Sequence, residues 1–206
     1  ASVPEILVDG VLEWLAEQGR PALVAEDALF DLGDGAVREA LLSLDDYLLD
    51  RYGQTPTGQF SAWGTQAAAT RWSSTGDKRF IAHMDRLNRW YLAEHGQTLS
   101  LPGNHCAAVE GLASYLAVLQ QTGQASSAMA GELEQQIASA MRHSLALQIL
   151  PGQRAITLED RVIYPTMMAS ATGSLLTSAG STRTQIDMTA HCLAAMVGAA
   201  RAGVGP

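Results

Sequence analysis

The sequence has 206 residues, of which 47% are hydrophobic and 17% are charged, and its formal net charge is −8 at pH 7. This length and balance are typical of one globular domain with a substantial core, so we expect a single domain over residues 1–206. Thirteen basic residues are scattered along the chain and Lys78 is the only lysine, which argues against a nucleic-acid-binding protein and against an anionic membrane surface as partner.

The hydropathy pattern predicts no membrane span. No apolar run reaches the roughly 18–20 residues that a spanning helix needs. The longest weakly polar stretch, residues 188–204, contains His191 and Arg201 and predicts a buried helix. The sequence shows no signal peptide and begins with Ala1, which fits an exported protein after processing and also a trimmed chain, so the compartment stays open.

In the first part of the chain we expect three helices and one loop. Residues 5–18 and 22–32 show helical spacing of apolar side chains, and residues 36–52 carry the clearest amphipathic pattern. Residues 53–62 are rich in Gly, Pro, Ser and Thr and predict a loop.

The rest of the chain is also predicted to be helical. The expected helices cover residues 63–74, 77–95, 103–121, 125–149, 165–178 and 181–201. Asp77 is a suitable N-cap for the second of these, and Ser181 or Thr182 for the last. Alternating strand patterns do not recur, so the sequence predicts an all-α fold without a large sheet.

Three short stops divide this helical part into hairpins. Their glycines are Gly76, Gly123 and Gly180, which are 47 and 57 residues apart. This spacing fits antiparallel helix pairs that bury a shared apolar face only when they stack. The first helix of each pair is rich in small residues, around 64–69, 106–113 and 169–174. Small side chains let helix axes approach closely, as an inner layer requires.

Two segments resemble a known superfamily. Residues 63–80, which include Thr75, Gly76 and Asp77, resemble hairpins of the α/α-toroid, or six-hairpin glycosidase-like, superfamily, and residues 104–115 are similar to another inner helix of that kind. The resemblance covers roughly residues 36–200. It implies antiparallel helical hairpins that form a partial or complete α/α toroid, with a glycan in its central cavity. It assigns no catalytic residue.

Three residues near the C-terminus form the first candidate site. Arg183, Asp187 and His191 are four residues apart, so on one helix they share a face. Asp187 could then fix the tautomer of His191 for general acid–base catalysis, and Arg183 could hold an anionic group. The alternative is a solvated ion pair with the histidine packed against a neighbouring helix.

The second candidate site lies at the start of the helix predicted over residues 103–121. Asn104 is a plausible N-cap or ligand contact, and Glu110 is an acid in an otherwise apolar helix. On an inner helix, Glu110 would project into a central cavity and serve as a general acid. The alternative is a structural carboxylate paired with an arginine such as Arg142, Arg154 or Arg161.

The only two cysteines, Cys106 and Cys192, each follow a histidine, His105 and His191. They could form a disulfide, contribute to a metal site or sit as two small buried side chains. The spacing matches no compact zinc motif, and we predict no metal and no cofactor.

Aromatic residues cluster around the predicted loop and could stack on sugar rings. We select Trp63 and Trp72 as sugar contacts, with Gln66 as a polar contact. The alternative is that these aromatic side chains pack the core of the hairpin.

Two functions follow from these patterns. The first is a carbohydrate-active protein that processes a glycan or small-molecule ligand by hydrolysis, elimination or epimerisation, with Glu110 and Asp187 as acid/base candidates and His191 and Arg183 as orienter and charge clamp. The alternative is a non-catalytic helical-repeat module that binds a protein or peptide in its groove, which the lack of a catalytic motif supports.

Overall fold

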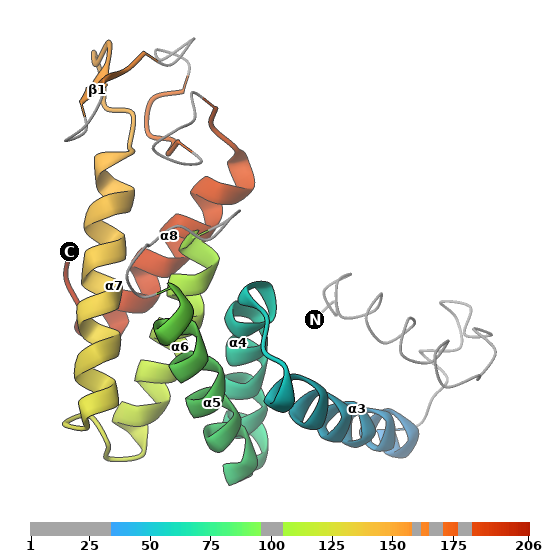
Figure 1. Cartoon of the computed structure of the whole chain (residues 1–206). Helices are drawn as coiled ribbons and strands as arrows, with labels where there is room; N and C mark the ends of the chain where they lie inside the picture. The colour runs from blue at the N-terminus through green and yellow to red at the C-terminus, as the bar shows by residue number, and fades with distance from the viewer. Residues whose placement is uncertain (1–33, 96–104, 158–161, 165–170, 177–182) are drawn as a thin grey trace. The chain divides into compact units, whose positions relative to one another are not determined.

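The computed structural model describes residues 34–95, 105–157, 162–164, 171–176 and 183–206, and within them the fold is all-α. Six helices make up most of this part of the chain (Figure 1). Their bounds are α3 Asp34–Gln54, α4 Gly58–Thr75, α5 Lys78–His95, α6 His105–Gln121, α7 Ala128–Ala146 and α8 Ile186–Arg201. The predicted all-α class is therefore confirmed. The helices expected over residues 5–18 and 22–32 lie outside the described residues.

The chain divides into two compact units, Ala1–Arg51 and Tyr52–Pro206, with the boundary inside α3. In the first unit the description covers the N-terminal part of α3, which agrees with the helix predicted over residues 36–52. The second unit holds the remaining helices and all the candidate site residues.

The loop predicted over residues 53–62 is mostly helical, which corrects that prediction. Helix α3 continues to Gln54 and α4 begins at Gly58. Thr57 explains the early start, because its side-chain oxygen accepts a hydrogen bond from the Phe60 N–H at 3.2 Å and caps α4.

Helices α4 and α5 form the first predicted hairpin. Helix α4 ends at Thr75 and is capped by Gly76, which has a φ of 70° and donates its N–H to the Trp72 carbonyl at 2.7 Å. Asp77 then accepts a hydrogen bond from the Arg79 N–H at 2.8 Å, so its predicted N-cap role is confirmed. This bond, together with the Arg79 guanidinium, lowers the pKa of the Asp77 carboxyl.

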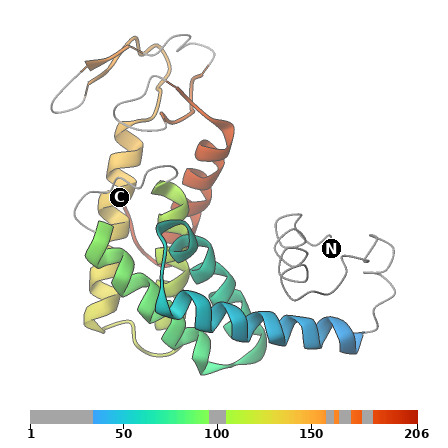
Figure 2. The same cartoon turned by 45° about the vertical axis from the view of Figure 1, so that its right-hand side comes forward.

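The layer around α6 organises the second unit. Helix α6 packs between α4 and α8, while α5 packs mainly on α4 and α7 mainly on α6 (Figures 1 and 2). Cys106 joins Cys192, and Gln120 donates its amide N–H to the Ala202 carbonyl at 2.8 Å. The later residue of α6 therefore lies beside the later residue of the α8 segment in both pairs, which means that α6 and α8 run parallel.

Small residues set the spacing of this layer. A Cβ atom on Gly111 of α6 would lie 2.9 Å from the Ala62 carbonyl oxygen of α4, so the two backbones are in direct contact there. Ala107, Ala108 and Ala113 of α6 are also buried. The predicted role of small side chains in close helix packing therefore holds for α4 and α6.

The third predicted hairpin does not form as expected. The second helix of the second hairpin, expected over residues 125–149, ends at Ala146. In the third hairpin, residues 171–176 of the helix expected over 165–178 form a turn and two β-bridges. The backbone explains the difference, because Gly173 has a φ of 90° and donates its N–H to Ile149. Strands β1 Ile156–Thr157 and β2 Val162–Ile163 pair antiparallel, and Leu147, Ile149, Ile156 and Leu176 form a small core beside them. Helix α8 therefore begins at Ile186 rather than at 181.

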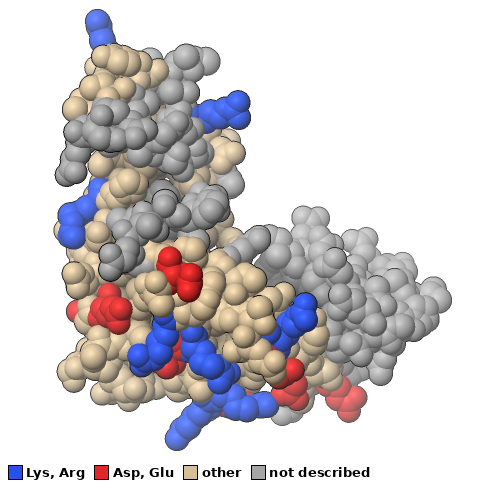
Figure 3. All heavy atoms as spheres, in the orientation of Figure 1, with Lys and Arg blue, Asp and Glu red and all other residues tan. Residues whose placement is uncertain are grey.

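Charged side chains near α5 are interspersed rather than segregated by sign. Figure 3 shows basic and acidic atoms side by side over the region of α5. Arg79 pairs with Asp77, and Arg89 pairs with Asp85, each at 2.8 Å. Such exposed pairs contribute little to stability.

In the described part of the chain, no helix combines the length and apolarity that a bilayer crossing requires.

A buried histidine on α5 makes stability depend on pH. His83 is 2% exposed, its Nδ1 has no hydrogen-bond partner within the described residues, and burial with the nearby Arg86 lowers its pKa to about 4. The unfolded chain takes up this proton near pH 6.5 and the folded chain only near pH 4. The protein should therefore keep its full stability above pH 6.5, and its free energy of unfolding should fall by about 3 kcal/mol as the pH decreases from 6.5 to 4.

We expect His83→Leu to flatten this part of the profile, measured by urea unfolding at pH 7, 6, 5 and 4.5. The slope of the wild-type protein in the same buffers is the reference for this comparison. An unchanged slope in His83→Leu would contradict the assignment.

Candidate functional site

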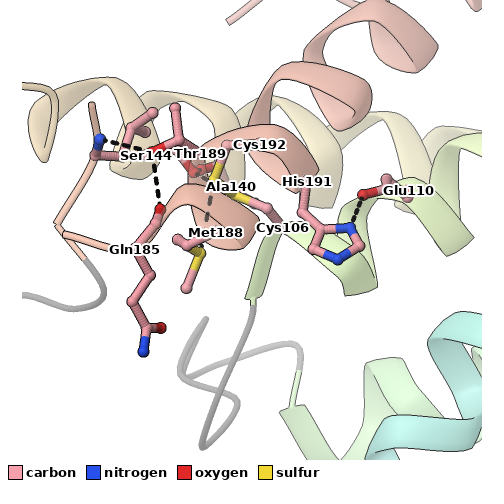
Figure 4. The surroundings of a disulfide bond; sticks show 10 residues. Cys106, Glu110, Ala140, Ser144, Gln185, Met188, Thr189, His191 and Cys192 are labelled. Carbon is pink, nitrogen blue, oxygen red and sulfur yellow. Dashed lines mark hydrogen bonds and ion pairs between the residues drawn. A yellow bond between two sulfur atoms is a disulfide. The ribbon is translucent and has the colours of Figure 1, made fainter. Parts of the chain in front are cut away.

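The structure brings together Glu110 of α6 and His191 of α8. The Glu110 Oε1 atom lies 2.6 Å from His191 Nδ1 (Figure 4). The contact exists because α6 and α8 are adjacent and parallel, which places two residues 81 positions apart at the same level. The sequence selected both residues but did not pair them with each other for catalysis.

This geometry assigns roles to the two imidazole nitrogens. When Glu110 is ionised, its carboxylate can only accept hydrogen bonds, so in that state the Nδ1 atom of His191 carries the hydrogen and donates it to Glu110. The Nε2 atom is then the basic nitrogen. The side chains are 26% and 13% exposed for His191 and Glu110, so the pair is partly shielded while the histidine remains accessible. An imidazole oriented in this way can transfer a proton to or from a ligand.

Trp63 of α4 completes the cluster. Its ring lies edge-on to the His191 ring, with centroids 5.1 Å apart and an interplanar angle of 68°. Trp63 is 41% exposed, so it offers ring surface to a ligand beside the Glu110–His191 pair. The preceding residue, Ala62, is the one that contacts Gly111, so the close packing of α4 on α6 fixes the tryptophan at this level.

A disulfide between Cys106 and Cys192 holds the site together. Of the three possibilities left open by the sequence, the structure has the disulfide. Cys192 directly follows His191, and Cys106 lies one helical turn before Glu110, so the bond fixes both parts of the pair (Figure 4). Both cysteines are 1% exposed. Among the described residues, no group of three His, Cys, Asp or Glu side chains is placed to bind a metal ion.

Of the other residues of the first candidate site, Asp187 lies on the same helix as His191 and Arg183 does not. Asp187 is in the first turn of α8, four residues before His191, and its side chain lies outside the description. Arg183 precedes α8, and its neighbour Thr184 pairs with Leu176 in a β-bridge. The prediction that Arg183 belongs to the same helix is therefore wrong, because the bridge delays the helix start to Ile186.

The predicted ligand contacts separate into two groups. Gln66 follows Trp63 by three residues on α4, and its Nε2 atom is buried without a hydrogen-bond partner in the described part of the chain. Trp72 follows Trp63 by nine residues, which places it on the opposite face of α4, since nine steps of 100° amount to two and a half turns. Asn104 lies outside the described residues.

Sequence reasoning missed the contact between Trp63 and His191, which lie on different hairpins. Periodicity within a helix reports which face is buried and carries no information about which helix lies beside it. The chain matches no family model, no curated protein and no solved structure, so a functional argument rests on the geometry of the site.

Proposed function

We propose that Trp63, Glu110 and His191 bind a glycan or a related polar small molecule and that His191 transfers a proton to or from it. The observation that carries the proposal is the 2.6 Å contact between Glu110 and His191 beside a half-exposed tryptophan. The side chains come from three different helices, and the disulfide fixes two of them.

Each side chain has a distinct role in this proposal. Trp63 provides a flat apolar surface on which a sugar ring can stack. Glu110 holds the tautomer and orientation of His191, and the Nε2 atom of His191 accepts the proton of a bound hydroxyl or C–H group. A single oriented base supports elimination, in which it removes a C–H proton and the leaving group departs from the neighbouring carbon with its bonding electrons. Epimerisation would also need a second group that returns a proton to the opposite face. Hydrolysis by two carboxylates would also need Asp187, with a separation of about 5 Å for retention or about 6.5–9.5 Å for inversion.

The architecture and the disulfide support related parts of the proposal. Parallel helices in one layer with partner helices across them are what a partial α/α toroid would contain, and we keep that ring as a proposal. Arg183 remains a candidate charge clamp, and Asn104 and Gln66 remain candidate ligand contacts. Since disulfides persist mainly in oxidising compartments, Cys106–Cys192 favours an exported protein.

Ligand binding can be tested with one tryptophan variant and one matched control. We expect Trp63→Ala to weaken the affinity for a glycan found by array screening about tenfold, which is about 1.4 kcal/mol, because the stacking surface is lost. Trp72→Ala removes the same side chain from the opposite face of α4 and should leave the affinity unchanged. Calorimetric titration gives both values. Equal losses in the two variants would contradict the proposed site.

Proton transfer is tested separately from binding. Against a ligand that binds, His191→Gln should lower turnover by about 100-fold or more while keeping affinity near that of the wild-type protein. Glu110→Gln keeps an acceptor oxygen but not the charge, and should lower turnover less. If the ligand binds at Trp63 and no product forms in the wild-type protein, the catalytic part of the proposal is wrong.

The second candidate function is the non-catalytic helical-repeat module. The observation that favours it is an exposed apolar face on α8, at Ile186, Leu193 and Val197. Capture of a protein partner by this face, without glycan binding at Trp63, would favour the module over the carbohydrate-active protein.

A further inference from the structure

Helix α8 is apolar on both of its faces. Met188, Cys192, Ala195 and Ala199 point into the second unit and are buried. On the opposite face, Ile186, Leu193 and Val197 are 91%, 63% and 41% exposed. Ala190, Ala194 and Ala200 are exposed beside them. A surface helix normally places charged or polar residues on this side, and a helix that is apolar all round is normally buried.

The exposed residues of α8 form one stripe that is separate from the candidate site. Ile186, Ala190, Leu193 and Val197 follow the four- and three-residue spacing of a helix–helix contact. His191 lies about 120° around the helix from the middle of this stripe, at 100° per residue. A partner on the stripe would therefore leave Trp63 and His191 accessible.

The order of large and small residues fits a second α8 in antiparallel orientation. We consider the antiparallel register in which Leu193 of one copy lies against Ala194 of the other, so that the two residue numbers of every facing pair sum to 387. Ala190 then lies against Val197, and Ile186 lies against the aliphatic part of Arg201. At the first two levels a large side chain meets a small one, as close packing of two helices requires.

Charge supports the same orientation. Arg201 lies in the last turn of α8 and Asp187 in the first. An antiparallel pair brings the first turn of one copy next to the last turn of the other, so both ends combine an acidic with a basic residue. A parallel pair would place like charges together at each end.

We propose that a second copy of this chain covers the exposed face of α8, in a two-fold symmetric dimer in which the two α8 helices are antiparallel. The contact is isologous, since the same stripe serves both copies, and it closes without leading to larger assemblies. This inference does not depend on the carbohydrate-active function, and it assigns to a second copy the face that the non-catalytic module would offer to another partner.

The mass of the protein in solution tests the proposal. By light scattering after size exclusion at about 0.15 M salt, where the repulsion between two acidic copies is screened, we expect a dimer. Leu193→Glu places two carboxylates next to the two-fold axis and should raise the dimer dissociation constant at least 100-fold. Leu145→Glu is the matched control, because Leu145 is also an exposed leucine on a helix, at 39% exposure, and should leave the dimer intact.

A charge exchange tests the orientation. Asp187→Arg and Arg201→Asp should each weaken the dimer several-fold, and the double variant should restore it. A wild-type protein that is monomeric at 100 µM would overturn the proposal. So would a dimer that Leu193→Glu leaves unchanged, or a double variant that is weaker than both single variants.

Discussion

Removal of the Cys106–Cys192 disulfide is expected to lower the free energy of unfolding by about 4–5 kcal/mol. The two cysteines are separated by 86 residues, so the bond removes a large loop-closure entropy from the unfolded chain. For a protein of this size the loss corresponds to a decrease in Tm of roughly 10–15 °C. Urea unfolding and calorimetry of Cys106→Ala/Cys192→Ala against the wild-type protein measure it.

Two measurements check whether Cys106 and Cys192 are oxidised to a disulfide in the wild-type protein. Both cysteines are buried, so alkylation of the native, unreduced protein should label neither, and alkylation after unfolding with reductant should label both. The double variant should show the same Tm with and without reductant. A double variant within 1 kcal/mol of the wild-type protein, or thiols that react without reductant, would contradict the disulfide assignment.

The second large effect is expected at Gly111. A methyl group there would lie 2.9 Å from the Ala62 carbonyl oxygen and 3.1 Å from its Cα atom, closer than side-chain carbons normally approach backbone atoms. Since a backbone cannot rotate away as a side chain can, α4 and α6 must separate. We expect Gly111→Ala to cost about 2–3 kcal/mol in urea unfolding.

Gly131 of α7 provides the matched control. It is exposed within a helix, and a Cβ atom there would have no neighbour within 4 Å. Gly131→Ala should therefore stabilise the protein by about 0.5–1 kcal/mol, because alanine restricts the unfolded chain and favours the helix. Replacement of glycine by alanine is thus expected to lower the free energy of unfolding at position 111 and to raise it at position 131. If Gly111→Ala were neutral, α4 and α6 would not be in backbone contact.

Local signals in the sequence predicted the first two hairpins well. The stop at Gly76, the cap at Asp77 and the small residues of α4 and α6 are each readable from a few neighbouring positions, and the structure has all of them. Such features depend on backbone conformation and side-chain size, which the local sequence determines.

The C-terminal part was predicted less well, because tertiary contacts override helix propensity there. Residues 171–176 have a helix-like composition, yet their backbone groups pair with Leu147 and Ile149. The Glu110–His191 contact of the candidate site was not predicted for the same reason, because it also depends on tertiary structure. Glu110 and His191 could each be selected as unusual polar residues in apolar helices, but their contact depends on the adjacency of α6 and α8, which no local pattern encodes.

The position of α6 between α4 and α8 has a consequence for motion. Helix α6 contacts the other four helices of its unit, so its amide hydrogens can exchange with solvent only when the whole unit opens. Helix α8 lies at the side of the layer and is held to α6 by the disulfide and the Glu110–His191 contact in its first half and by one hydrogen bond past its end. Glu110 is thus carried by the helix that contacts the other four described helices of the unit, and we expect adjustment to a ligand to come from the side of His191.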